Sequence, residues 1–343
     1  MNKFFSIIIP TYNSKQLKKG LDSIESQPAK DLIEVIIVDD NSIDDSHLNL
    51  LSNYTFDYKI IKNTVNLGPG GARQVGLDVA QGKWITFLDH DDYFNPKCFH
   101  IVKEQIEHSQ CTALFETQII VAKDEYWPMT QQYVTDSGLN CMLHGKFFNK
   151  DFLIKNNIKF NSKIYAQEDV YFLAVIEGII GLCPDYDYKS RVSSPIITYY
   201  WFLWDDSTSH KKINGKEYIL YYFKDYITCN YDSYRFVYDL YPNEKFKNNK
   251  LTSCLLYCYL FYEKFYYVYS KKNIDISDVL EHCKNFKNII LDELNITHEE
   301  LIEIMNDEVR AEMYLILANK VNECSPDFSI PQHTLTQFLN MLK

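Results

Sequence analysis

Four β-rich runs alternate with helical patterns in the first 110 residues, and this alternation restricts the chain to few architectures. The β-rich runs cover residues 4–9, 33–38, 58–62 and 84–88, and the helical patterns cover 14–26, 44–51, 69–80 and 96–109. Successive strand-helix units predict an α/β sheet that is mostly parallel and flanked by helices. Residues 7–9 and 35–38 are apolar without alternation, which is expected when both faces of a strand are covered.

The rest of the chain changes in character, and at 343 residues more than one domain is expected. Strand-like runs at 114–121 and 196–201 flank a helical pattern that begins near Glu168, and together they should complete the sheet. Beyond residue 215 the pattern is helical and rich in Tyr, over residues 217–226, 250–270, 276–286, 298–321 and 334–342. We therefore expect an α/β domain over residues 1–212, with halves at 1–110 and 111–212, and a helical domain over 213–343.

The balance of charge and the cysteine pattern narrow the class of protein. The chain has 46 acidic and 35 basic residues, a net charge of -11. This charge argues against a broad nucleic-acid interface, which needs clustered Lys and Arg, but allows a small anionic substrate held by a few groups. Nine Cys without a CxxC pair are typical of reduced thiols in a cytosolic protein.

The chain shows neither a signal-peptide pattern nor the roughly 20 consecutive apolar residues that a membrane-spanning helix needs. We expect a cytoplasmic location. Peripheral attachment to the inner face of the membrane is left open.

Polar side chains follow three of the predicted strands. Residues 10–13 are Pro-Thr-Tyr-Asn, residues 39–42 are Asp-Asp-Asn-Ser, and residues 89–92 are Asp-His-Asp-Asp. Ligands of open α/β sheets bind beyond the carboxyl ends of the strands. Five carboxylates on one edge repel each other unless a cation or hydrogen-bond donors compensate, and a divalent metal is the economical expectation.

The spacing of Asp89 and Asp91 suggests a pair of metal ligands. In an extended segment their side chains point the same way, and His90 points the opposite way. Hard oxygen ligands of this kind suit Mg²⁺ or Mn²⁺ together with substrate phosphates. The alternative is that Asp89 or Asp92 caps the helix that starts near Pro96, which would explain one Asp but not the cluster.

Residues 66–73, Asn-Leu-Gly-Pro-Gly-Gly-Ala-Arg, form a glycine-rich turn that opens a helix. Free N–H groups and the helix dipole favour an anion there, and Arg73 adds a planar set of donors that suits phosphate oxygens. Tight packing between helix and strand also selects glycines, and the spacing is not GxGxxG. Both interpretations stay open.

Taken in order, five segments of the chain resemble the family 2 glycosyltransferases of the GT-A fold. The segments are residues 6–13, 38–42, 66–68 with 72–73, 87–92 and 167–169, and the resemblance covers about residues 4–210. It implies a Rossmann-like GT-A catalytic domain that uses a UDP-sugar as donor. The half at 1–110 would bind the nucleotide sugar and the half at 111–212 the acceptor.

The resemblance also implies roles for individual residues on the donor side. Pro10, Tyr12 and Asp40 would line the pocket for the uracil or other base. Arg73 would approach the diphosphate.

The same resemblance assigns the metal. Asp91 would bind Mn²⁺ or Mg²⁺, with Asp89 near the ribose or sugar or as a second ligand. His210 would close over the diphosphate or complete the metal shell.

The resemblance further implies inversion at the anomeric carbon, which requires a base for the acceptor hydroxyl. Asp169 matches the base position of the family, and Glu168 is the second candidate. The alternative is that both acids only stabilise a helix N-terminus. His144 and Lys146 lie in a segment that in relatives is beside the acceptor site.

These observations predict an inverting, metal-dependent hexosyl- or N-acetylhexosaminyltransferase that acts on a hydroxyl of a cell-surface glycan or wall polymer. Glycosylation of protein or of modified DNA, and nucleotide-sugar binding without turnover, are the alternatives. The helical domain would select the acceptor, form a homo-oligomer or contact a membrane, and the sequence does not distinguish these roles.

Overall fold

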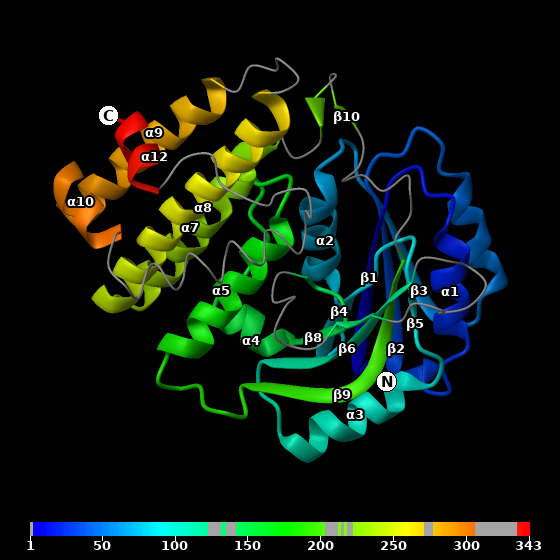
Figure 1. The fold of residues 1–343 in the computed structure, drawn as a ribbon. Coiled ribbons are helices and arrows are strands. Elements are labelled where there is room, and N and C mark those ends of the chain that lie inside the picture. Colours follow the sequence, from blue (N-terminus) through cyan, green and yellow to red (C-terminus); the bar gives the residue numbers. More distant parts are fainter. Residues whose placement is uncertain are drawn as a thin grey trace. The chain divides into compact units, whose positions relative to one another are not determined.

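The computed structural model divides the chain into two compact units, residues 1–207 and 208–343, which we describe separately. The residues described are 3–122, 132–134, 142–202, 212–213, 216–217, 222–270, 277–305 and 335–343 (Figure 1). The predicted functional halves of the first unit, and the predicted boundary after residue 212, stay predictions.

The first unit contains one large sheet with the strand order β3-β2-β1-β4-β8-β6-β9-β5, and β7 pairs with β6. The strands are β1 (Phe5–Thr11), β2 (Ile33–Asp39), β3 (Asp57–Lys62), β4 (Trp84–Phe87), β5 (Tyr93–Phe94), β6 (Leu114–Ala122), β7 (Gln132–Val134), β8 (Lys146–Asn149) and β9 (Arg191–Phe202). Strands β1 to β4 are mutually parallel, whereas β8 is antiparallel to both β4 and β6. β6 and β9 pair in parallel, and since β8 is antiparallel to both β4 and β6, they run in the same direction as β1 to β4. The sheet is therefore mixed but mostly parallel, as predicted.

Helices cover both faces of this sheet. They are α1 (Leu17–Glu25), α2 (Gly68–Val79), α3 (Cys98–Ser109), α4 (Lys150–Lys155) and α5 (Glu168–Leu182), with the 3-10 helices η1 (Lys30–Leu32) and η2 (Ser46–Asn53). The helix predicted at 44–51 is thus a 3-10 helix, in a segment whose Ser and Asn side chains compete with helical backbone bonds.

Alternation along β1 explains the two layers. Phe5, Ile7 and Ile9 join the core cluster that contains the apolar residues of α1, η2 and α3. Ile8 faces the other way, towards α2, where a Cβ on Gly76 would lie only 2.4 Å from it. Figure 1 shows α1 and α2 on opposite sides of these strands.

The register brings three strand ends to one edge. Thr11 pairs with Asp39 across β1 and β2, and the Asp40 N–H donates to the Thr11 carbonyl at 2.8 Å. On the other side of β1, the Leu88 N–H donates to the Ile8 carbonyl at 3.0 Å. The polar segments after β1, β2 and β4 therefore lie at the same edge, as the sequence predicts.

The second unit is mainly helical and has its own apolar core. Its elements are β10 (Lys212–Ile213), β11 (Lys216–Glu217), α7 (Phe223–Leu240), α8 (Glu244–Ser270), α9 (Ser277–Leu294), α10 (His298–Met305) and α12 (Leu335–Met341). Tyr234, Leu255, Phe286 and Phe338 are buried in that core. The helix predicted from residue 217 is wrong at its start, because residues 216–217 form a strand and the helix begins at Phe223.

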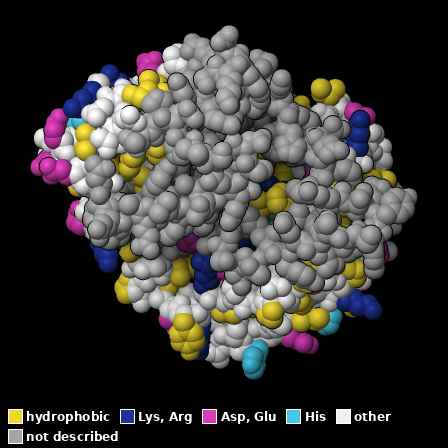
Figure 2. All heavy atoms as spheres, viewed as in Figure 1, with side chains coloured by type: hydrophobic (Ala, Val, Ile, Leu, Met, Phe, Trp, Pro, Cys, Tyr) yellow, Lys and Arg dark blue, Asp and Glu magenta, His cyan; other side chains and the backbone are white. Residues whose placement is uncertain are grey.

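Within the described parts of the chain, no helix is both long enough and apolar enough to cross a bilayer. On the face drawn in Figure 2, the Lys and Arg side chains shown in colour lie scattered, with acidic side chains near several of them.

Candidate active site

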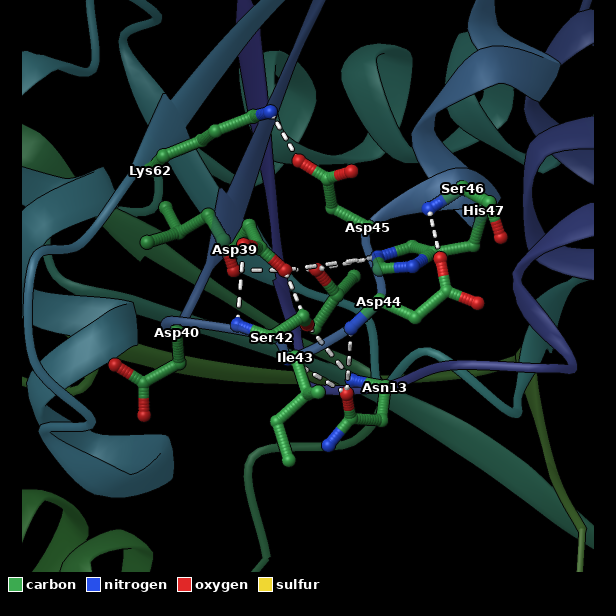
Figure 3. A network of polar contacts seen from close by, with 12 residues as sticks. Asn13, Asp39, Asp40, Ser42, Ile43, Asp44, Asp45, Ser46, His47 and Lys62 are labelled. Atoms are coloured by element: carbon green, nitrogen blue, oxygen red, sulfur yellow. Dashed lines mark hydrogen bonds and ion pairs between the residues drawn. The ribbon is translucent and has the colours of Figure 1, made fainter.

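The loops after β1 and β2 are held together by hydrogen bonds (Figure 3). Asn13 adopts a left-handed backbone conformation with φ 48°, and its Oδ1 accepts the N–H groups of Ile43 and Asp44 at 2.9 and 3.4 Å. The Asn13 N–H donates to Ser42 Oγ at 2.8 Å, and the Ser42 hydroxyl donates to Asp39. These bonds satisfy the loop backbone and fix one strand-end loop against the other.

A buried histidine, His47, contacts the ends of both strands beneath these loops. His47 Nε2 lies 3.3 Å from Thr11 Oγ1 and 3.7 Å from Asp39 Oδ1. All three side chains are buried. The sequence reasoning missed His47, because nothing in its local pattern separates it from a core histidine.

Asp40 points away from this network in Figure 3. Its carboxylate accepts the Leu67 N–H at 2.9 and 3.1 Å and the Asn63 side-chain amide at 2.8 Å, so it ties the end of β2 to the loop before α2. Tyr12 is 47% exposed and Pro10 is partly exposed at the end of the neighbouring strand. The structure brings Pro10, Tyr12 and Asp40 to one edge, and their place in a base pocket stays a prediction.

The acidic segment after β4 is a turn. The Asp92 N–H donates to the Asp89 carbonyl at 3.1 Å, so residues 90 and 91 occupy the middle of the turn. The expectation of an extended segment with Asp89 and Asp91 on one side is therefore wrong, since Asp-His-Asp-Asp favours a turn once β4 ends. Within this turn, His90 Nδ1 lies 3.3 Å from Asp91 Oδ1.

Asp92 is a buried structural acid. Its Oδ1 accepts the Phe202 N–H at 2.7 Å and its Oδ2 accepts the Tyr199 hydroxyl at 2.8 Å. Burial raises the pKa of Asp92 well above its ordinary value. The following helix α3 has no side-chain cap at its start, so the capping alternative for the acidic cluster is wrong.

A buried arginine links the acidic turn after β4 to α5. Arg73 NH2 donates to Asp89 Oδ1 and Arg73 NH1 donates to Glu168 Oε1, each at 2.6 Å. On the other side of Asp89, His144 Nε2 lies 3.2 Å from Oδ2. The resulting chain His144–Asp89–Arg73–Glu168 connects four separate segments, and we call it the buried charge chain.

The members of the buried charge chain shift one another's ionisation. Burial alone would raise the pKa of Asp89, but the charges of Arg73 and His144 hold this pKa well below its ordinary range. Burial raises the pKa of Glu168, although Arg73 opposes the shift. The predicted approach of Arg73 to a diphosphate stays a prediction, because both of its terminal nitrogens bind carboxylates here.

Protein donors compensate most of the acidic charge that suggested a metal. Asp40, Asp89 and Asp92 each accept hydrogen bonds at both carboxylate oxygens. Charge crowding therefore does not by itself require a cation. The residues nevertheless fit one, since ligand atoms of Asp89, Asp92 and His144 lie within 4.8 Å of one another and Asp91 is on the same turn.

Asp169 has the environment of a base that works near neutral pH. It lies in the first turn of α5, and its Oδ1 accepts the Val170 N–H at 2.8 Å. Burial, and then the neighbouring charge of Glu168, raise the pKa of Asp169 to about 7. This value suits general base catalysis, while the bond to backbone is also compatible with a helix-stabilising role.

The glycines at the start of α2 allow α5 to come close. A Cβ on Gly70 would lie 2.9 Å from the Glu168 side chain, and a Cβ on Gly68 would lie 2.6 Å from the Tyr165 ring. These contacts support the packing interpretation of the glycines, and the phosphate interpretation stays a prediction. His210, the remaining predicted site residue, lies outside the described residues.

Comparison with known proteins agrees with the motifs. Residues 6–168 match the model of the family described as glycosyl transferase family 2. The chain is 33% identical over 199 residues to a poly(ribitol-phosphate) beta-glucosyltransferase of Bacillus spizizenii, and this alignment covers 53% of this chain and 31% of that protein. It is 44% identical over 92 residues to GalNAc(5)-diNAcBac-PP-undecaprenol beta-1,3-glucosyltransferase of Campylobacter jejuni, and this alignment covers 25% of this chain and 29% of that protein. The chain thus spans about a third of the length of these curated relatives.

Solved structures share the fold. A crystal structure of the 1–349 fragment of Staphylococcus aureus TarS with UDP-GlcNAc matches with a TM-score of 0.60 at 18% identity, covering 86% of this chain and 82% of that chain. The same fragment with UDP gives 0.58 at 17% identity, covering 82% and 80%. These matches confirm the predicted GT-A-like α/β fold with a helical C-terminal region.

Proposed function

We propose that this chain, whose residues 6–168 match the model of glycosyl transferase family 2, moves a sugar from a UDP-sugar to an acceptor hydroxyl. The transferred group is a hexosyl or N-acetylhexosaminyl group, and the acceptor is a cell-surface glycan or wall polymer. The names of the relatives support this acceptor class, because the Bacillus protein and TarS are both named as transferases for poly(ribitol phosphate).

The observation that carries the proposal is the placement of Asp169. This acid, with a pKa near 7, directly follows Glu168, which the buried charge chain ties to the acidic turn after β4. An ionised Asp169 takes the proton of the acceptor hydroxyl as its oxygen attacks the anomeric carbon. The bond between that carbon and the diphosphate breaks on the opposite face, UDP leaves, and the configuration inverts.

The other residues bind and orient the donor in this proposal. Pro10, Tyr12 and Asp40 contact the base, and the charge of Arg73 lies towards the diphosphate. Mn²⁺ or Mg²⁺ would be held by Asp91 with Asp89, and would offset the charge that develops on the leaving diphosphate.

The predicted cytoplasmic location fits a nucleotide-sugar donor. The helical unit would select the acceptor, contact a membrane or form a homo-oligomer. These roles stay predictions.

Titration calorimetry and a transfer assay test the proposal. The wild-type chain should bind UDP, and UDP-glucose or UDP-GlcNAc, more tightly with Mn²⁺ than with chelator. Asp91→Ala should abolish transfer and the Mn²⁺ dependence of UDP binding while the fold is retained. Asp31→Ala, which changes an exposed acid away from the carboxyl ends of the strands, serves as the matched control.

Two results would count against the proposal. Full transfer by Asp91→Ala, or by the wild type in excess chelator, removes the metal from the account. Failure of the wild-type chain to bind any UDP-sugar removes the function itself.

A further inference from the structure

We propose that His144 is a positioning residue that holds the Asp89 carboxylate, and through it Arg73 and Glu168, in register with the base Asp169. The inference rests on the proposed function. It assigns to the segment before β8 a task on the donor side of the site.

The first support is the geometry around Asp89. Arg73 NH2 binds Oδ1 at 2.6 Å and His144 Nε2 binds Oδ2 at 3.2 Å. One bond would leave the carboxylate free to rotate, whereas two donors on different oxygens fix its plane. His144 is therefore the second of two restraints on this acid.

The second support is that the His144 ring is itself immobilised. It stacks on Tyr199 with ring centroids 4.7 Å apart, and it lies 5.6 Å from the Trp201 ring. The next residue, Gly145, has φ 65°, and a Cβ there would lie 2.8 Å from Ile119. The ring position is thus set by the sheet.

The buried ring nitrogen Nδ1 gives a third indication. It has no hydrogen-bond partner among the described residues, while Nε2 faces Asp89. A buried polar atom without a partner is unfavourable, so a compensating contact has to keep the ring in this orientation. The contact of Nε2 with the Asp89 carboxylate supplies this compensation, with Nε2–H as the hydrogen-bond donor.

The restraint is transmitted to the catalytic base by short contacts. Arg73 bridges Asp89 and Glu168, and its side chain is only 8% exposed. Gly70 lets the Glu168 side chain approach α2 closely. A shift of Asp89 would therefore move Arg73 and Glu168, and Asp169 is the next residue.

A metal-ligand role for His144 is the competing interpretation, because the ring is close to both Asp89 and Asp92. The contacts favour positioning. Asp92 already accepts the Phe202 N–H and the Tyr199 hydroxyl, and Mn²⁺ or Mg²⁺ prefers oxygen ligands.

The experiment compares two replacements of His144 in the full chain. His144→Phe keeps the aromatic stacking and removes the hydrogen-bond donor to Asp89. His144→Gln keeps a hydrogen-bond donor, because its amide N–H reaches about as far as Nε2. His100→Phe makes the same replacement on α3 and is the control. Steady-state transfer, UDP affinity and Mn²⁺ affinity are measured for each variant, and circular dichroism checks the fold.

Positioning predicts a specific pattern. His144→Phe should lower kcat about 10- to 100-fold, as small displacements of reacting groups do, with the donor KM and the Mn²⁺ affinity within about threefold of wild type. His144→Gln should recover most of kcat, and His100→Phe should leave it unchanged. If His144→Phe does not fold, His144→Asn replaces it, because its shorter amide falls short of Asp89.

Other outcomes overturn the inference. A variant without the hydrogen-bond donor at position 144 whose kcat stays within about twofold of wild type rules out the positioning role. A loss of Mn²⁺ affinity that matches the loss of kcat identifies His144 as a metal ligand. An active wild type with a fully active His144→Phe rejects this inference alone. A wild type that transfers from none of the UDP-sugars rejects the proposed function, and this inference with it.

Discussion

Replacing Arg73 with Met tests the buried charge chain directly. The side chain volume and apolar stem are largely kept, but Glu168 and Asp89 lose their shared cation. The Glu168 side chain is only 10% exposed, so water does not replace the lost partner. Removal of one partner of a buried ion pair costs about 3–5 kcal/mol.

Proton uptake sets an upper bound on the cost at Glu168. Protonation of a glutamate with an ordinary pKa of about 4.3 at pH 7 costs about 3.7 kcal/mol, and the unpaired acid cannot cost more than this. We therefore expect Arg73→Met to destabilise the first unit by about 4 kcal/mol at pH 7.

The deficit should shrink in acid. Burial in the fold raises the pKa of Glu168, so the protonated side chain is tolerated better than the ionised one. The stability that protonation of Glu168 contributes is present at low pH and is lost as the pH rises. At pH 5 the deficit at Glu168 should fall to about 1 kcal/mol.

Urea unfolding followed by Trp fluorescence, in the absence of metal and nucleotide, measures this effect. All four Trp residues lie between positions 84 and 204, so the signal reports the first unit. Lys18→Met removes a cation from an exposed pair with Asp22 and should change stability by less than about 1 kcal/mol. A change for Arg73→Met as small as that of Lys18→Met, or one that does not depend on pH, would refute the reasoning.

Three further predictions concern the rate of transfer and the binding of UDP. The rate of transfer should rise with pH along a limb with an apparent pKa of about 7, because Asp169 must be ionised to accept a proton, and a rate that is flat from pH 5 to 9 would contradict this. Gly70→Ala should lower kcat, because the added Cβ would lie only 2.9 Å from the Glu168 side chain. At Gly181 a Cβ meets no described atom within 4 Å, so Gly181→Ala should keep activity and stabilise α5 by up to about 1 kcal/mol. Equal effects of the two variants on kcat would count against the packing role of Gly70. Asp40→Ala should weaken UDP binding about tenfold in calorimetry, since it releases the Leu67 N–H and alters the proposed base pocket, and unchanged affinity would exclude that role.

The sequence predicts the first four strands because their signal is local. Residues 35–38 are uniformly apolar, and the structure places β2 at Ile33–Asp39 with every residue buried. The same pattern puts Asp39 and Asp40 at the strand end. The short strands β5 and β8 have two and four residues, too few to show a period, and so the mixed part of the sheet was not predicted.

The buried charge chain depends on contacts that a local pattern does not carry. Arg73 and Glu168 are 95 residues apart, and His144 is 55 residues from Asp89. The identity of Arg73 suggested phosphate binding, and only the fold shows two carboxylates at its terminal nitrogens. Likewise, the turn at residues 89–92 follows from where β4 ends rather than from the spacing of the acids.

The most direct test of the proposed function is NMR analysis of the product formed from an α-linked UDP-sugar, UDP-glucose or UDP-GlcNAc, and a poly(ribitol phosphate) acceptor with Mn²⁺. The account predicts a β-linked sugar from the wild-type chain and no product from Asp169→Asn. An α-linked product, or wild-type activity in Asp169→Asn, would contradict it.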